Sequence, residues 1–209
     1  MPLQNRVDPE GRIVATPARG TMFGNRGGCF HRPDRTLLRR RFASKQWICC
    51  VLSFKDRRRS LMSPGLYTEL FFLDEATAFA AGHRPCFECR RADAVRYAEL
   101  WNAIDGRPGR ASAPEMDDFL HRQRISKHGD KLCVEMRFGD VAPGAMVRAG
   151  GRPMLVGDGG VVRPWSFEGY GAPIGLAASA SVDVVTPQQT HTILKMGYRV
   201  GVHPSAKDR

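Results

Sequence analysis

Two cysteines separated by two residues, Cys86 and Cys89, constrain this chain more than any other feature of its sequence. A Cys-x-x-Cys turn folds back on itself, so both thiolates can reach one metal ion. A tetrahedral Zn²⁺ ion takes four ligands. The pair is therefore half of a zinc site, and the rest of the chain has to supply the remaining ligands.

The segment before the two cysteines predicts a strand and then a short helix. Residues 71–73 form an apolar run typical of a buried strand. Asp74 is a good helix N-cap, the following residues are rich in alanine, and Gly82 stands where a left-handed C-terminal residue is expected. The Cys-x-x-Cys turn therefore follows a helix directly. That order argues against a redox dithiol, which in the thioredoxin pattern begins a helix after a strand.

This segment resembles a known family of zinc domains. Residues 81–89 read Ala-Gly-His-Arg-Pro-Cys-Phe-Glu-Cys, and with the strand and helix before them they resemble the second half of the Ada-type zinc-binding domain. That family repairs methyl phosphotriesters in DNA and has smaller relatives that bind metal. The resemblance covers mainly residues 71–91, with a looser match back to about residue 29. It implies a zinc site and DNA as a partner.

The upstream half of the family pattern is altered in this chain. The family holds zinc with four cysteines, and one of the upstream pair accepts the methyl group. Here His31 and Arg35 stand where those two cysteines would be. An imidazole is a poorer methyl acceptor than a thiolate, so we expect no methyl transfer and a mainly structural metal site.

The third and fourth ligands are expected among four residues of the N-terminal half: Cys29, His31, Cys49 and Cys50. Residues 47–54 predict a strand, in which neighbouring side chains point to opposite faces. Cys49 and Cys50 should therefore not bind the same ion, and Cys50 shares its face with large aliphatic residues, which we assign to the core. We predict Cys86, Cys89, Cys50 and His31 as the ligands of one Zn²⁺ ion.

The chain is strongly basic, with 32 Lys+Arg against 21 Asp+Glu and a net charge of +11 in 209 residues. Arginine suits phosphate, and such a charge favours nucleic acid as a partner, DNA or RNA. The alternative is a basic surface that only keeps the protein soluble. The predicted nucleic-acid-binding residues form three clusters: Arg39, Arg40 and Arg41; Arg57, Arg58 and Arg59; Arg90 and Arg91.

The sequence also indicates the cellular compartment of the protein. No apolar run approaches the roughly 18 residues of a membrane span, and no leader is visible at the N-terminus. We expect a cytoplasmic protein without a membrane partner. Its six cysteines should then be thiols and metal ligands rather than disulfides. The oligomeric state is not indicated.

The fold class predicted is α+β. Residues 1–104 should form an Ada-like zinc-binding domain, a small antiparallel sheet with helices, in which residues 1–28 are a flexible lead-in. The loop at residues 105–110 suggests a boundary. Residues 105–209 should form a β-rich domain or lobe, a β-meander or small barrel. A C-terminal helix should follow it, capped by Thr186.

Three functions remain open at this point. The first is a structural zinc domain of a nucleic-acid-binding protein, which we favour. The second is a zinc-dependent enzyme acting on DNA or RNA, and the third is a zinc-stabilised protein-interaction module. Phosphate-loop, dinucleotide, serine-hydrolase and metalloprotease motifs are missing, and deamination lacks its His-x-Glu or Cys-x-Glu element upstream. The carboxylates nearest the cysteines, which could act as a base, are Glu69, Glu75 and Glu88.

Overall fold

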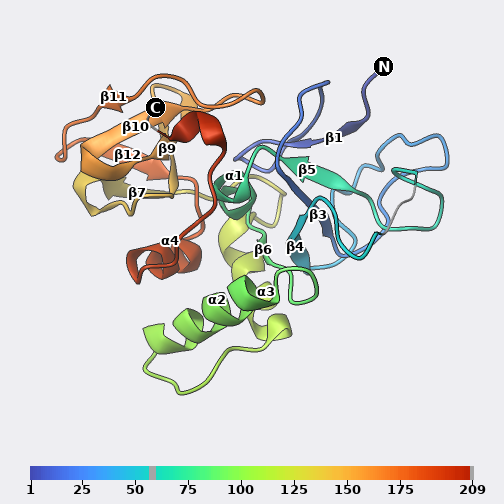
Figure 1. The fold of residues 1–209 in the computed structure, drawn as a ribbon, viewed down its shortest axis with the longest axis horizontal. Helices are drawn as coiled ribbons and strands as arrows, with labels where there is room; N and C mark the ends of the chain where they lie inside the picture. Colours follow the sequence, from blue (N-terminus) through green and yellow to red (C-terminus); the bar gives the residue numbers. More distant parts are fainter. Residues whose placement is uncertain (57–59, 208–209) are drawn as a thin grey trace.

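Two six-stranded sheets and four α-helices make up the fold, which is drawn in Figure 1 from a computed structural model that describes residues 1–56 and 60–207. The predicted α+β class is confirmed. No helix within these residues is long and apolar enough to cross a membrane.

The first sheet belongs to the N-terminal half and has the strand order β2-β1-β5-β3-β4-β6. Its strands are β1 (Gln4–Val7), β2 (Ile13–Ala15), β3 (Met22–Arg26), β4 (Trp47–Val51), β5 (Leu70–Phe72) and β6 (Arg84–Pro85). The pairings of β1 with β5 and of β4 with β6 are parallel, and the others are antiparallel. The expected lead-in at residues 1–28 is wrong, because it supplies β1, β2 and β3.

The second sheet belongs to the C-terminal half and has the order β11-β10-β9-β8-β12-β7. Its strands are β7 (Val134–Arg137), β8 (Met146–Ala149), β9 (Arg152–Val156), β10 (Val161–Pro164), β11 (Ile174–Gly175) and β12 (Ser181–Val184). Its pairings are antiparallel. Strands β8 to β11 follow one another as the predicted meander, and β12 extends it between β8 and β7.

The helices are α1 (Glu75–Ala80), α2 (Arg91–Ile104), α3 (Ala113–Arg124) and α4 (Gln188–Lys195). Short 3₁₀ turns lie at Phe138–Asp140, Asp158–Gly160 and Pro204–Ala206. Helix α4 is the C-terminal helix expected from the sequence. Thr186 does not cap it, since the Thr186 hydroxyl accepts instead from the backbone N–H of Met146 at 2.9 Å.

Helix α1 lies between the two sheets, where it contacts β5 and β8 (Figure 1). All of its residues are buried. Asp74 caps it as predicted, accepting from the N–H of Thr77 at 2.8 Å. Gly82 ends it with φ +87°, and a Cβ there would lie 2.6 Å from the side chain of Arg124. Only glycine meets both conditions, a left-handed backbone and a close neighbour.

The largest apolar cluster crosses the proposed boundary at residue 104. It includes Tyr97 and Trp101 of α2 together with Val147 of β8 and Val162 of β10. Helix α2 therefore packs on the C-terminal half although its sequence directly follows the Cys-x-x-Cys turn. The division into domains 1–104 and 105–209 stays a prediction.

A buried ion pair ties β6 to helix α3. Arg84 donates to both carboxylate oxygens of Asp117, at 2.9 and 2.7 Å, and the side chains of the pair are 2% and 8% exposed. Asp118, the next residue, pairs with Lys45 at 2.7 Å at a half-exposed site. The two neighbouring aspartates thus differ mainly in burial.

This contrast gives a prediction on stability. Asp117→Ala should lower the free energy of unfolding by about 3–5 kcal/mol, because it leaves the Arg84 charge buried without its partner. Asp118→Ala is the matched control and should leave stability nearly unchanged, since a solvated pair contributes little. Urea denaturation of both variants measures the difference, and equal effects would contradict the prediction.

Candidate metal centre

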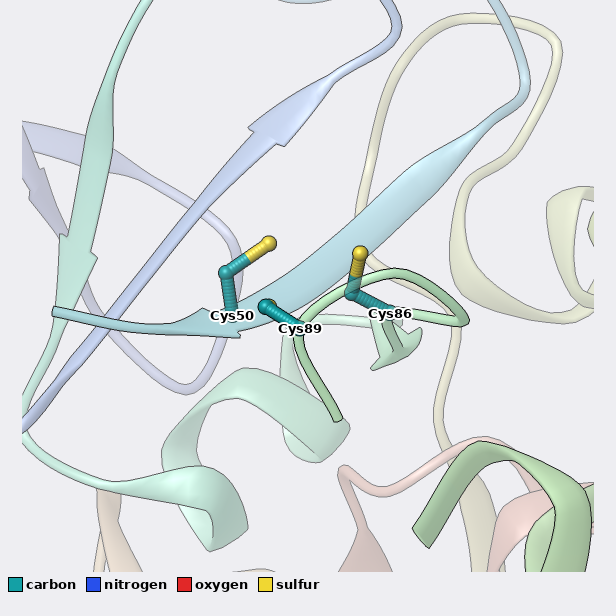
Figure 2. A group of neighbouring side chains, drawn as sticks. All are labelled: Cys50, Cys86 and Cys89. Atoms are coloured by element: carbon teal, nitrogen blue, oxygen red, sulfur yellow. The ribbon is translucent and has the colours of Figure 1, made fainter. Parts of the chain in front are cut away.

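Three cysteines from two separate elements meet at one point. Cys50 lies on β4, while Cys86 and Cys89 lie in the turn between β6 and α2. Their sulfur atoms all lie within 4.8 Å of one another. Figure 2 shows Cys50 on its strand and the other two on the loop beside it. This group can hold a metal ion.

Strand pairing brings these residues together. β6 runs parallel to β4, with Arg84 opposite Ile48 and Pro85 opposite Cys49. The backbone N–H of Cys86 then donates to the carbonyl of Cys49 at 3.0 Å. That bond places the turn directly beside Cys50, and the Arg90 N–H closes the turn on the Cys86 carbonyl at 3.0 Å.

The surroundings of Cys86 favour a thiolate. The backbone N–H of Glu88 donates to the Cys86 sulfur at 3.4 Å. The pKa of Cys86 falls to about 5, first because Cys50 hydrogen-bonds to it and second because backbone N–H groups of the turn do the same. The hydrogen bond between Cys50 and Cys86, together with burial, raises the pKa of Cys50. A thiolate is the form of cysteine that binds metal.

A cavity of about 540 Å³ opens beside the three cysteines. Its apolar wall includes Phe23, which lies 6.1 Å from Tyr67 and 5.8 Å from Phe71 between ring centres. The remaining lining residues are Asn25, Ile48, Cys50, Val51, Leu52, Phe54, Leu61, Glu69, Cys86, Glu88 and Cys89. The site is therefore next to a space of ligand size.

Of the three carboxylates singled out in the sequence, two line this cavity. Glu69 is buried and accepts from the N–H of Met62 at 2.7 Å, while Glu88 is exposed. Glu75 lies elsewhere, paired with Arg90 at 2.7 Å. The aromatic wall of Phe23, Tyr67 and Phe71 is not predicted by the sequence analysis. The period of a strand gives one signal for it, since Glu69, directly before β5, and Phe71 are two residues apart and therefore lie on the same face.

His31, a predicted ligand, lies outside the cysteine group. Its Nδ1 contacts the Thr68 hydroxyl at 2.7 Å, and its Nε2 contacts the Ser63 carbonyl oxygen at 3.2 Å. Cys29 stays beside His31, with its sulfur 3.7 Å from Nδ1. Both ring nitrogens of His31 are thus in contact with Ser63 and Thr68 rather than with the cysteines. The described residues provide three ligands in the cysteine group, namely Cys50, Cys86 and Cys89.

Cys49 and Cys50 point to opposite faces of β4, as their adjacency requires. Cys49 is fully buried in an apolar cluster of the N-terminal half, whereas Cys50 lines the cavity. The assignment of the Cys50 face to the core is wrong. The face of Trp47 and Cys49 is the more deeply buried one, and Leu52 is 55% exposed.

The predicted arginine clusters differ in their environment. Arg39, Arg40 and Arg41 are exposed. The guanidinium of Arg90 is already paired with two carboxylates, those of Glu75 and Asp93, each at 2.7 Å. Of the cluster Arg90 and Arg91, only Arg91 is exposed. Arg57, Arg58 and Arg59 lie outside the described residues.

Comparison with family models, curated proteins and solved structures found no match. The resemblance of residues 71–91 to the Ada-type domain therefore depends on the motif itself.

The geometry predicts which cysteines hold the metal. Cys50→Ala, Cys86→Ala and Cys89→Ala should each lower the bound metal well below one equivalent per chain, because each removes one of three thiolates. Cys49→Ala is the matched control and should retain the metal, since its side chain faces away. Elemental analysis of protein purified without chelator measures the content. Metal loss from the Cys49 variant alone would contradict this ligand set.

Proposed function

We propose that the chain binds one Zn²⁺ ion through Cys50, Cys86 and Cys89. Zinc–sulfur bonds of about 2.3 Å in a tetrahedron put the sulfurs about 3.8 Å apart. The sulfur atoms here lie within 4.8 Å of one another, so the group fits such an ion without rearrangement of the backbone. Soft thiolate donors also favour zinc over calcium or magnesium. The three-cysteine group is the observation that carries this proposal.

We further propose that residues 71–91 are an Ada-type zinc element. The order of strand, capped helix, Gly82 and Cys-x-x-Cys supports this, as does the resemblance in sequence. Cys50 on β4 supplies a thiolate that the altered upstream motif does not. Because His31 and Arg35 replace the family's upstream cysteines, methyl transfer by that pair is not part of the proposal.

The proposed partner is nucleic acid, bound through an Arg-rich face at Arg39, Arg40 and Arg41. These three side chains are exposed and follow one another in a chain with a net charge of +11. Counterion release from the phosphate backbone would supply most of the affinity. Arg90 is left out of this face because Glu75 and Asp93 already neutralise it.

This proposal predicts salt-dependent binding. Replacing Arg39, Arg40 and Arg41 together by alanine should weaken binding to duplex DNA. The slope of log K against log salt should fall by about 0.9 for each phosphate group that the variant no longer neutralises. A triple alanine variant of the exposed Arg137, Arg152 and Arg199, with the same change in charge, is the control. Fluorescence anisotropy at several salt concentrations measures both; equal effects of the two triple variants would show that only net charge matters.

The cavity favours a second candidate function, a zinc-dependent enzyme acting on DNA or RNA. Three protein ligands beside a cavity are the pattern of catalytic zinc sites, whereas structural sites have four. Zinc with an open position supplies a Lewis acid. Glu69 and Glu88 line the same space, where either carboxylate could accept a proton from a bound substrate. No observation on the described residues favours the other alternative, a zinc-stabilised protein-interaction module.

The open position can be tested with cobalt. Co²⁺ substituted for zinc should give a visible spectrum that shifts when azide is added, because the anion can enter through the cavity and bind the ion. The Cys49→Ala variant should respond like the wild type. A spectrum unaffected by azide at any concentration would show a closed site and favour the purely structural role.

A further inference from the structure

A second cavity, of about 600 Å³, lies on the other side of strand β4 from the cysteines. Trp47 lines it, whereas Ile48 and Cys50 line the first cavity, and alternate residues of a strand face opposite sides. The remaining lining residues are Gln4, Glu10, Gly11, Arg12, Ile13, Arg26, Arg39, Arg40, Arg41, Phe42, Ala81, Arg124, Ile125, His128, Gly129, Asp130 and Lys131. No metal-ligating cysteine is among them.

Positive charge dominates this lining. Of the described residues that line it, seven are Arg or Lys and two are acidic, Glu10 and Asp130. Glu10 is already occupied, because it pairs with Arg12 at 3.3 Å and with Arg148 at 2.8 Å. Asp130 accepts from the hydroxyl of Ser126 at 3.4 Å. The cavity therefore carries an excess of cations that its own acids do not neutralise.

The two deepest cations are Arg26 of β3, 2% exposed, and Arg124 at the end of α3, 0% exposed. Both guanidinium carbons lie 3.9 Å from the centre of the Trp47 ring, so they are at most 7.8 Å apart. Their partners among the described residues are neutral. Arg26 donates to the carbonyls of Gly11 and Arg41, and Arg124 to those of Gly82 and Lys45. Each also contacts a histidine ring nitrogen, Arg26 that of His83 at 3.4 Å and Arg124 that of His121 at 3.0 Å.

Two further observations concern the polar groups of this cavity. The buried Nε of Arg124 has no hydrogen-bond partner within residues 1–56 and 60–207. The ammonium of Lys131 donates to the carbonyl of Ala80 and forms no ion pair with a described residue. Burial lowers the pKa of Arg26 and Arg124 to about 9 and that of Lys131 to about 7. The end of helix α3 favours a cation at Arg124, but it does not account for Arg26 and Lys131.

We propose that this cavity binds a phosphate group with two negative charges, through Arg26, Arg124 and Lys131. Guanidinium groups match phosphate oxygens in geometry, and an anion would neutralise cations that are costly to bury alone. The volume is larger than a phosphate needs and lies in the range of small-molecule sites, so the organic part of the ligand fits as well. Arg39, Arg40 and Arg41 line the same cavity and are exposed, so they guide the anion inward.

The site is distinct from the metal centre, and its proposal stands without zinc. It shares Arg39, Arg40 and Arg41 with the proposed nucleic-acid face. The phosphate can therefore belong to a free small molecule or to the 5′ end of a strand, and only the second source rests on the proposed nucleic-acid partner.

Inorganic pyrophosphate is the first probe, tested on the full chain at constant ionic strength. We expect it to raise the melting temperature and to bind measurably in calorimetry, because a ligand of the folded state stabilises it. Lys131→Gln should weaken binding roughly tenfold or more, since it removes one charge-assisted hydrogen bond. Lys195→Gln, an exposed residue of α4 with the same change in charge, is the control and should bind like the wild type.

A folding control keeps this test decisive. Lys131→Gln removes a half-buried cation that forms no ion pair with a described residue, so in the absence of pyrophosphate it should melt no lower than the wild type. Arg26→Lys, which keeps the charge but loses the planar fork, should bind with intermediate affinity. If pyrophosphate does not bind, or binds equally to the Lys131 and Lys195 variants, the proposal is overturned.

A second pair of probes identifies the source of the phosphate. A single-stranded oligonucleotide with a 5′-phosphate should bind more tightly than the same strand without it, and pyrophosphate should compete, if the site holds a strand end. Equal binding of the two strands, with pyrophosphate binding still dependent on Lys131, assigns the site to a free phosphorylated molecule. Absence of all strand binding with retained pyrophosphate binding would refute the nucleic-acid partner while leaving this site intact.

Discussion

The buried carboxylate of Glu75 holds together the parts on which the candidate metal centre depends. At the first turn of α1 it binds the guanidinium of Arg90 at 2.7 Å, the hydroxyl of Tyr198 at 2.9 Å and the N–H of Gly201 at 2.7 Å. Arg90 directly follows Cys89. One carboxylate thus connects helix α1, the Cys-x-x-Cys turn and the C-terminal segment.

Strand β4 separates the two cavities described above. Its alternating side chains place Cys50 in the three-cysteine group beside the first cavity and Trp47 beside the buried arginines of the second cavity. Because β4 pairs with β3 on one side and with β6 on the other, its position in the sheet is fixed on both edges.

Local patterns predicted the parts of the site that depend on neighbours in sequence. The Asp74 cap and the glycine end of α1 follow from backbone hydrogen bonding, and the opposite orientation of Cys49 and Cys50 follows from the period of a strand. The position of His31 outside the cysteine group could not be predicted, because a residue's spacing from a motif does not say what surrounds it. Thr68 and Ser63, which contact the two ring nitrogens of His31, lie more than thirty residues away in the sequence.

The sequence by itself determined the α+β class, the Cys-x-x-Cys turn and the helix leading into it, because propensity, capping and side-chain periodicity act over a few residues. Tertiary structure decided that Cys50 meets Cys86 and Cys89, since that requires the parallel pairing of β4 with β6. It also decided which arginines are buried. Arg26, Arg84, Arg90 and Arg124 are the same residue type, but Arg84 and Arg90 pair with carboxylates. Arg26 and Arg124 instead contact carbonyl oxygens and histidine nitrogens, and that difference separates the structural ion pairs from the proposed anion site.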